Sequence, residues 1–239
     1  MRKAPYQVAY HARCGEEPFA RYSRDGSWIE FALAGGRRTE GRLRDPEPDG
    51  TQHRMRYANA VGPGLDLELT TRMRSWSKDV VIRSMEGIRG DALEVDFPFR
   101  LSGDLDVVIE GVVWDREHPV TTHGSVLFRD RKSGSIRFQA LPPEAMCDTP
   151  VPRFAAPVSL TFHHRWNGRE NTLVMTKRIE TAWIRPDLLP VRADVTLTAT
   201  PPTSDGKTTK ESSSDSYETT RSAAAGDTSS TASVQVGQA

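Results

Sequence analysis

The sequence predicts an all-β protein: an antiparallel β-sandwich of roughly ten or more strands, followed by a polar, extended C-terminal tail. Three observations indicate this fold. Nearly every apolar segment is short and alternates with polar residues, as expected for strands with one buried face. Turn-forming dipeptides such as Asp25-Gly26 and Ser102-Gly103 separate these segments. No segment before residue 200 keeps a helical spacing of apolar residues over three turns.

The first predicted strands alternate cleanly. Residues 27–33 place two sets of side chains on opposite faces: Ile29, Phe31 and Leu33, and Trp28, Glu30 and Ala32. After the turn at residues 62–64, Asp66 and Glu68 alternate with three leucines, and a second apolar run follows at residues 80–82. This phase predicts that the leucines are buried and that the two acids lie on a solvated face.

Later segments continue the pattern. Residues 91–101 oppose two sets of side chains: Leu93, Val95, Phe97, Phe99 and Leu101, and Glu94, Asp96 and Arg100. Residues 125–140 predict a hairpin with these inward positions: Val126, Phe128, Ile136 and Phe138. A second hairpin is predicted around Asn167-Gly168, a dipeptide typical of tight turns. Pro186 and Pro190 restrict their segment to a turn or a single 3₁₀ step.

The composition limits the classes of partner. The chain of 239 residues carries 32 basic and 32 acidic side chains, which gives no electrostatic case for nucleic acid or an anionic membrane. No stretch approaches the roughly 18 apolar residues of a membrane span. No signal peptide is visible, so we expect a fragment, a virion protein, or a passenger of another export system. Cys14 and Cys147 could pair or remain free thiols.

The composition changes near the C-terminus. Residues 199–239 are rich in Ser, Thr, Gly and Ala, so they are predicted to be a linker or tail. Residues 232–237 are an exception, because Val234 and Val236 would share one face of a strand. The predicted organisation is therefore a sandwich module over residues 1–198 and a tail over residues 199–239, in which residues 232–237 form a strand.

Paired acids are the first candidates for chemistry. Three pairs are spaced two apart, so each pair shares one face of a strand: Asp66 and Glu68, Glu94 and Asp96, and Asp104 and Asp106. Two carboxylates can hydrolyse a glycosidic bond, and carboxylates with backbone carbonyls can bind Ca²⁺. Three similar pairs on three strands are more typical of the polar face of a sheet. We therefore predict no catalytic residue here and no metal.

The other reactive side chains also lack a recognised pattern. The histidines have no metal-ligand spacing: His11, His53, His118, His123, His163 and His164. Neither cysteine has a local catalytic signature. The five tryptophans are either core anchors or exposed sugar-stacking surfaces: Trp28, Trp76, Trp114, Trp166 and Trp183. Single tryptophans in alternating strands favour the core, so no cofactor-binding residue is predicted.

Residues 57–84 resemble a segment of a β-rich module found in large bacterial surface and RHS-repeat proteins. The matching positions are Tyr57, Asn59, Pro63, Gly64, Leu65, Asp66, Leu67, Lys78, Asp79, Val80, Val81 and Ile82. Trp76 and Ser77 replace a usual Gly-Val. Residues 121–148 are similar to the hairpin of that module, and the following positions are similar to its closing segment: Trp183, Ile184, Pro190, Val191 and Asp194. Val195 stands where a proline is usual.

The resemblance covers roughly residues 18 to 197 and implies a non-catalytic module of an extracellular, wall-attached or toxin-delivery protein. The tail resembles the opening of a truncated DNRLRE-type sandwich at these positions: Asp215, Tyr217, Val234, Val236 and Gly237. We therefore expect a structural or interaction module at a cell surface or in a virion. Its partners would be proteins or its own copies, through sheet edges and the tail. The alternatives are a polysaccharide-binding module and a two-carboxylate glycosidase.

Overall fold

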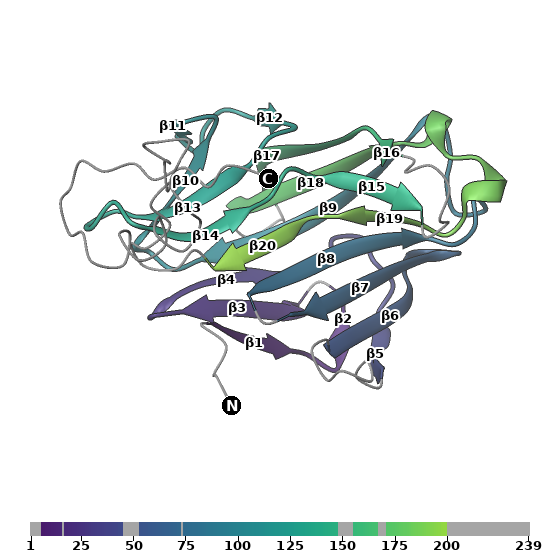
Figure 1. Ribbon diagram of the computed structural model, residues 1–239, viewed down its shortest axis with the longest axis horizontal. Helices are drawn as coiled ribbons and strands as arrows, with labels where there is room; N and C mark the ends of the chain where they lie inside the picture. Colours follow the sequence, from purple (N-terminus) through teal and green to yellow (C-terminus); the bar gives the residue numbers. More distant parts are fainter. Residues whose placement is uncertain are drawn as a thin grey trace, which may run out of the picture. The chain divides into compact units, whose positions relative to one another are not determined.

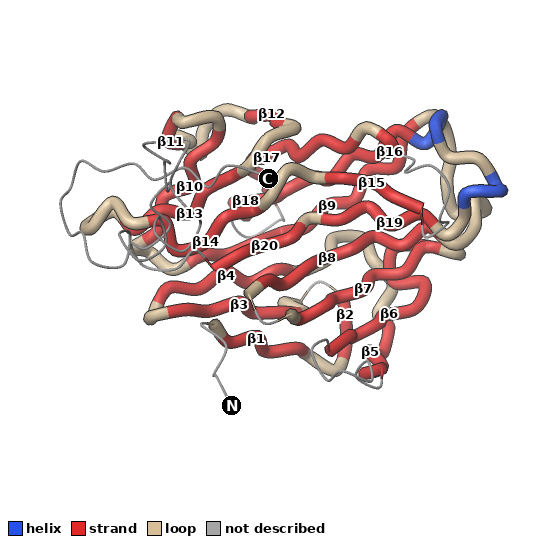
Figure 2. The backbone as a smooth tube through the Cα atoms, viewed as in Figure 1, coloured by secondary structure: helices blue, strands red, loops and turns tan. Residues whose placement is uncertain are grey.

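The computed structural model describes residues 6–15, 17–44, 53–72, 74–147, 155–166 and 171–199. Within these ranges the chain forms two antiparallel sheets and two short 3₁₀ helices, so the predicted all-β sandwich is confirmed. Strands make up most of the described backbone (Figure 2). The unit to which they belong ends at Thr200. Residues 200–239, and with them the predicted strand at 232–237, lie outside the described residues.

One sheet has seven strands, all paired antiparallel. Their order across the sheet is β1 (Gln7–Tyr10), β3 (Ala20–Arg24), β4 (Ser27–Phe31), β9 (Ala92–Leu101), β18 (Asn171–Glu180), β17 (Val158–Trp166) and β12 (Val120–Thr122). Strands β9 and β18 are ten residues long and form the centre of the sheet. We call it the seven-stranded sheet.

The other sheet has thirteen strands. Its main path is β11 (Val112–Val113), β10 (Leu105–Ile109), β13 (Val126–Asp130), β14 (Ile136–Ala140), β20 (Thr196–Ala199), β8 (Ser75–Ile82), β7 (Leu65–Thr71), β6 (His53–Gly62), β5 (Thr39–Arg44) and β2 (Arg13–Cys14). Three further strands join beside β8: β19 (Val191–Asp194), β15 (Glu144–Cys147) and β16 (Ala155–Ala156).

Aromatic side chains join the two sheets, which form the two layers seen in Figure 1. Tyr22 of β3 stacks on Trp76 of β8 with ring centroids 5.8 Å apart, and Tyr22 also contacts Phe138 of β14 at 5.1 Å. Phe31 of β4 lies 5.8 Å from the same Trp76 ring. One continuous apolar core therefore fills the space between the layers.

The prediction of which side chains point inward is confirmed for three strand regions. The inward side chains are buried as expected: Ile29, Phe31, Leu33, Leu65, Leu67, Leu69, Val95, Phe97 and Phe99. The first hairpin is confirmed in part, because Val126, Phe128 and Phe138 are buried but Ile136 is 36% exposed. The register shifts after Phe128↔Phe138, so that Arg129 pairs with Ile136. This β-bulge turns Ile136 to the outer face, which makes its predicted inward position wrong.

The second predicted hairpin also forms. Strands β17 and β18 pair over their whole length, from Val158↔Ile179 to Trp166↔Asn171. The Asn167-Gly168 dipeptide itself lies outside the described residues. The proline-rich segment contains two 3₁₀ turns, Thr181–Trp183 and Pro186–Leu188, where a single step was predicted.

Strands β19 and β20 pair with successive halves of β8 in one register. Ala193 pairs with Val80, and Thr196 pairs with Ser77. In this register Asp194 lies opposite Asp79, at the place where the ladder between the strands is interrupted. The backbone amide of Lys78 still donates to the carbonyl of Val195 at 3.2 Å.

Candidate functional site

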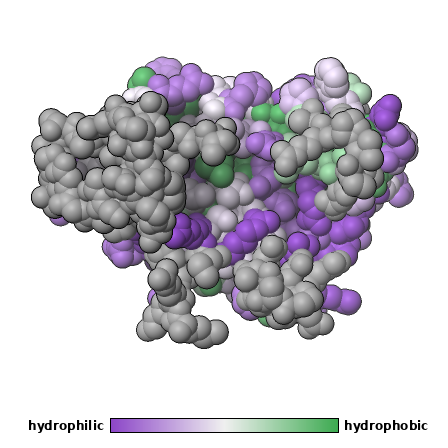
Figure 3. All heavy atoms as spheres, viewed as in Figure 1, coloured by the Kyte–Doolittle hydropathy of each residue, from purple (hydrophilic) through white to green (hydrophobic). Residues whose placement is uncertain are grey.

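Asp66 and Glu68 lie on the outer face of β7, but each is only 1% exposed. The prediction that they are solvated is therefore wrong. Arginine side chains from other elements cover them: Arg56 of β6, Arg83 after β8 and Arg192 of β19. Figure 3 shows hydrophilic side chains gathered over β6 and β7 on this face. A strand with apolar residues inside and paired acids outside is thus buried on both faces.

Asp66 accepts hydrogen bonds from two arginines and one backbone amide. The Asp66 Oδ2 atom lies 2.6 Å from Arg56 Nη2 and 2.5 Å from Arg83 Nε. The amide of Asn59 donates to Oδ1 at 2.8 Å. Burial opposes ionisation, but the hydrogen bonds from Asn59 and Arg83 and the charge of Arg56 outweigh it. They hold the pKa of Asp66 below its ordinary value.

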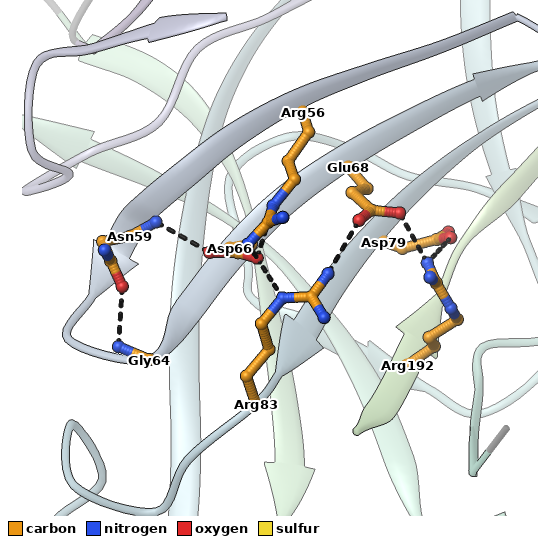
Figure 4. A network of polar contacts seen from close by, with 8 residues as sticks. All are labelled: Arg56, Asn59, Gly64, Asp66, Glu68, Asp79, Arg83 and Arg192. Carbon is orange, nitrogen blue, oxygen red and sulfur yellow. Dashed lines mark hydrogen bonds and ion pairs between the residues drawn. The ribbon is translucent and has the colours of Figure 1, made fainter. Parts of the chain in front are cut away.

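The turn before β7 explains why Asn59 is suited to this position. Asn59 has a positive φ of 55°, a conformation that asparagine tolerates better than most residues. Its side-chain Oδ1 accepts a hydrogen bond from the amide of Gly64 at 2.8 Å. The side chain therefore closes the turn, while its backbone amide holds Asp66 (Figure 4).

Glu68 extends the same chain of charges. Arg83 Nη2 lies 3.1 Å from Glu68 Oε1, and Arg192 Nη1 lies 2.7 Å from Oε2. Arg192 also lies 3.6 Å from Asp79 Oδ2. Acids and arginines alternate along this line (Figure 4), and we call the set the outer-sheet network: Arg56, Asp66, Arg83, Glu68, Arg192 and Asp79. Arginines thus contact the carboxylates of both Asp66 and Glu68.

The acids of the other two predicted pairs also have partners, although none of them is buried. Asp96 accepts from Arg165 and Thr176, both at 2.6 Å, and Glu94 accepts from Arg178 at 2.9 Å. Asp104 Oδ2 accepts from Ser27 at 2.6 Å, and Asp106 accepts from Arg131 at 2.6 Å. Each acid therefore stabilises contacts between neighbouring strands or loops.

Two lysines are wholly buried between the sheets, and the sequence pattern did not single out either as a site. Lys177 of β18 donates from Nζ to the carbonyls of Lys78 at 3.0 Å and Ala193 at 2.8 Å. The ammonium of Lys78 lies 3.5 Å from the Phe97 ring centroid and 4.0 Å from that of Phe31. Burial lowers the pKa of both lysines. The sequence does carry one signal for this site. Lys78 lies two residues before the apolar Val80, so both side chains share the buried face of β8.

Asp79 of β8 and Asp194 of β19 interact electrostatically with Lys177. Their carboxyl groups hydrogen-bond to each other, and burial together with the charge of Asp194 raises the pKa of Asp79 well above its ordinary value. The Thr196 hydroxyl donates to Asp194 Oδ2 at 2.5 Å. Asp79 therefore holds its proton to a higher pH than an ordinary aspartate does.

Three of the histidines bond to different partners. His118 Nδ1 lies 2.7 Å from Asp115 Oδ2, and this exposed contact raises the pKa of His118. His123 bonds to the Val158 carbonyl, and His163 to the Thr176 hydroxyl. Among the described residues, no three His, Cys, Asp or Glu side chains gather as a metal site.

Both cysteines are free thiols, which settles the alternative left open by the sequence. Cys14 is buried, and burial raises the pKa of its thiol to about 12. A thiol with a raised pKa holds little thiolate at neutral pH, so Cys14 is a poor nucleophile. Cys147 is half-buried.

The tryptophans divide into two groups. Trp76 and Trp114 are buried core residues, as the sequence favours, whereas Trp166 is 64% exposed and Trp183 is 59% exposed. Trp28 is half-buried, and the Arg21 guanidinium covers its ring at 4.3 Å.

Trp166 borders a hollow with a volume of about 730 Å³. Its lining includes Glu30, Pro98, Arg100, Arg165 and Thr172. We call it the Trp166 hollow. An exposed indole beside charged and hydroxyl groups is the combination that stacks and hydrogen-bonds sugars.

Comparison with known proteins adds no further identification. No family model matches the chain, and no curated protein matches it. Within the described residues, no helix has the length and apolar character needed to cross a bilayer.

Proposed function

We propose that the chain is a non-catalytic structural and interaction module of a cell-surface, wall-associated or virion-type protein. The observation that carries this proposal is the engagement of the candidate acids. In the outer-sheet network, Asp66 and Glu68 are buried beneath arginines, so their role is to hold strands together. The resemblance to the β-rich module of surface and RHS-repeat proteins supports the same class.

A glycosidase is the enzymatic alternative, and Glu68 gives the sharpest test. The chain would be incubated with a broad set of chromogenic glycosides, beside the variant Glu68→Gln. We expect no turnover from either protein and a loss of stability in the variant, because Arg83 and Arg192 lose a charged partner. Turnover by the parent that Glu68→Gln abolishes while it stays folded would overturn the proposal.

The interaction part of the proposal rests on the sheet edges. In the described part of the chain, β1 and β12 end the seven-stranded sheet, and each has only one neighbouring strand. A terminal strand can extend its sheet by pairing with another chain. We expect sedimentation velocity to show association that grows with protein concentration. A monomer at all concentrations would argue against self-association.

Carbohydrate binding is the second candidate function, favoured by the Trp166 hollow. The indole of Trp166 is open, whereas Arg21 covers that of Trp28. Trp183 provides a matched control, because it is similarly exposed but does not line this hollow. A glycan array would support the idea if binding disappears in Trp166→Ala and persists in Trp183→Ala. No binding by the parent, or equal loss in both variants, would reject it.

A further inference from the structure

The seven-stranded sheet carries a second hollow beside the Trp166 hollow. It has a volume of about 380 Å³, its lining includes Gln7, Arg21 and Trp28, and we call it the Trp28 hollow. Arg21 and Trp28 alternate with buried residues along their strands, so both lie on the outer face of the sheet. Arg21 Nη1 lies 3.2 Å from Oε1 of Glu30, which lines the Trp166 hollow. The two hollows are therefore adjacent, and we call them together the sheet track.

The sheet track runs across the strands. The Trp28 hollow includes residues of β1, β3 and β4, and the Trp166 hollow includes residues of β4, β9, β18 and β17. These six strands are neighbours in the sheet, in this order. With about 4.8 Å between neighbouring strands, the track is about 24 Å long. A linear polymer fits such a length better than a single small molecule.

The middle of the track has a floor of short or apolar side chains. Ala32, Pro98 and Val174 line the Trp166 hollow, and Val174 is only 1% exposed. The amide of Ala32 donates to the carbonyl of Pro98 at 2.8 Å, which holds two parts of this floor together. Arg100 and Trp166 also line the hollow and are exposed. An apolar floor beside exposed polar groups suits a sugar ring, because the ring has an apolar face and hydroxyl groups at its edge.

The charge of the track favours an anion. The cations that line it in the described part of the chain are all arginines: Arg21, Arg24, Arg100 and Arg165. Asp25 and Glu30 are the acids of the lining, and Asp96 adds a third, because its Oδ2 lies 2.6 Å from Arg165 Nη1. Four arginines and three acids leave an excess of positive charge, although the whole chain has a net charge of zero.

Arg21 and Arg165 keep donors for a ligand. Each uses Nη1 for an acid of the protein, Glu30 or Asp96, and their side chains remain 42% and 57% exposed. A guanidinium carries five N–H donors in a planar fork, so each arginine can bind a further carboxylate. The Arg21 guanidinium also lies 4.3 Å from the centroid of the Trp28 ring, which helps to fix its position.

We propose that the sheet track binds a linear acidic polysaccharide. Uronate carboxylates bind Arg21 and Arg165, and the sugar rings between them lie over the apolar floor. The two arginines belong to β3 and β17, four strand spacings or about 19 Å apart, so the ligand must carry repeated carboxylates along a chain. This inference rests on the carbohydrate-binding candidate of the proposed function and names its class of ligand.

The test is isothermal titration calorimetry of the full-length chain with a panel of uronate oligosaccharides. Each is compared with its carboxyl-reduced, neutral form. We expect the parent to bind an acidic oligosaccharide about tenfold or more tightly than the neutral form, because reduction removes charge-assisted hydrogen bonds. Higher ionic strength should reduce this preference. Single-stranded DNA serves as a polyanion without uronates and should not bind.

Variants of the track separate the charge effect from damage to the fold. Arg165→Gln should remove most of the preference for the acidic form and leave the affinity for the neutral form unchanged. Glu30→Gln should strengthen binding of the acidic form, because it removes a carboxylate that competes for Arg21, and a folding defect does not produce a gain. Arg178→Gln is the matched control. Arg178 lies on the same sheet and pairs with Glu94 at 2.9 Å, but it lines neither hollow.

The outcomes distinguish this inference from the candidate on which it rests. Equal affinity of the parent for acidic and neutral forms overturns the inference and leaves carbohydrate binding intact. Binding of no oligosaccharide rejects both. Equal losses in Arg165→Gln and Arg178→Gln, or binding of single-stranded DNA as tight as that of the uronates, indicates unspecific attraction of anions and also overturns the inference.

Discussion

Phe97 and Glu94 occupy opposite faces of β9, so substitutions at these positions test which face of the strand points into the core. Phe97 is buried and lies against the Lys78 ammonium, whereas Glu94 is exposed and pairs with Arg178 at the surface. We expect Phe97→Ala to lower the free energy of unfolding by about 3 to 5 kcal/mol, because it leaves a cavity. Glu94→Ala should change it by less than about 0.5 kcal/mol. Similar costs in urea denaturation would contradict the assigned register.

Asp66 makes stability depend on pH. Because its folded pKa lies below the ordinary 3.8, the stabilisation is present above that value and is lost as the pH falls through the folded pKa. Asp66→Asn should cost about 1 to 3 kcal/mol near neutral pH, since two charged hydrogen bonds weaken. The difference in the free energy of unfolding between the variant and the parent should become smaller below about pH 4. Urea denaturation at a series of pH values measures it.

Asp187 is a suitable control for that series. It pairs with Arg185 at 2.9 Å, but both side chains are exposed, so solvent screens the contact. Asp187→Asn should leave the pH profile unchanged. If the difference in the free energy of unfolding between the parent and Asp66→Asn stays constant down to acidic pH, the carboxylate charge is not what stabilises the site.

At the level of strands, the alternation of apolar and polar residues was sufficient to predict which side chains are buried, provided that the partner strand keeps a regular register. The alternation in residues 91–101 correctly placed Val95, Phe97 and Phe99 in the core. Ile136 was misplaced because a bulge in its pairing with β13 changes the face of the residue. A bulge depends on how two strands meet, so the alternation within one strand carries little signal of it.

The candidate site was less predictable than the fold for a similar reason. The sequence showed Asp66 and Glu68 on one face but could not show that the face is covered. Arg192, which binds Glu68, is 124 residues away along the chain. Lys177 likewise meets the carbonyl of Lys78 across 99 residues. Such contacts follow from the order of strands in the sheet, which alternation alone does not determine.

The turn between β6 and β7 can be tested at Gly64, with Gly90 in the loop between β8 and β9 as the control. Gly64 has a φ of +70°, and a Cβ added there would lie 2.6 Å from the Ser84 Cβ. Gly64→Ala should therefore cost about 2 to 4 kcal/mol through backbone strain and the steric clash. Gly90 has a φ of +83° but no atom within 4 Å, so Gly90→Ala should cost only about 1 kcal/mol. Equal costs in urea denaturation would show that the contact with Ser84 is unimportant.

In the whole molecule, one kind of interaction holds the two sheets against each other, and another holds strands together within one sheet. Aromatic contacts such as that of Tyr22 with Trp76 hold the two sheets together through apolar packing, which is non-directional. The outer-sheet network instead ties β6, β7, β8 and β19 together within one sheet. Lys177 combines the two functions, because it starts on one sheet and ends on two strands of the other.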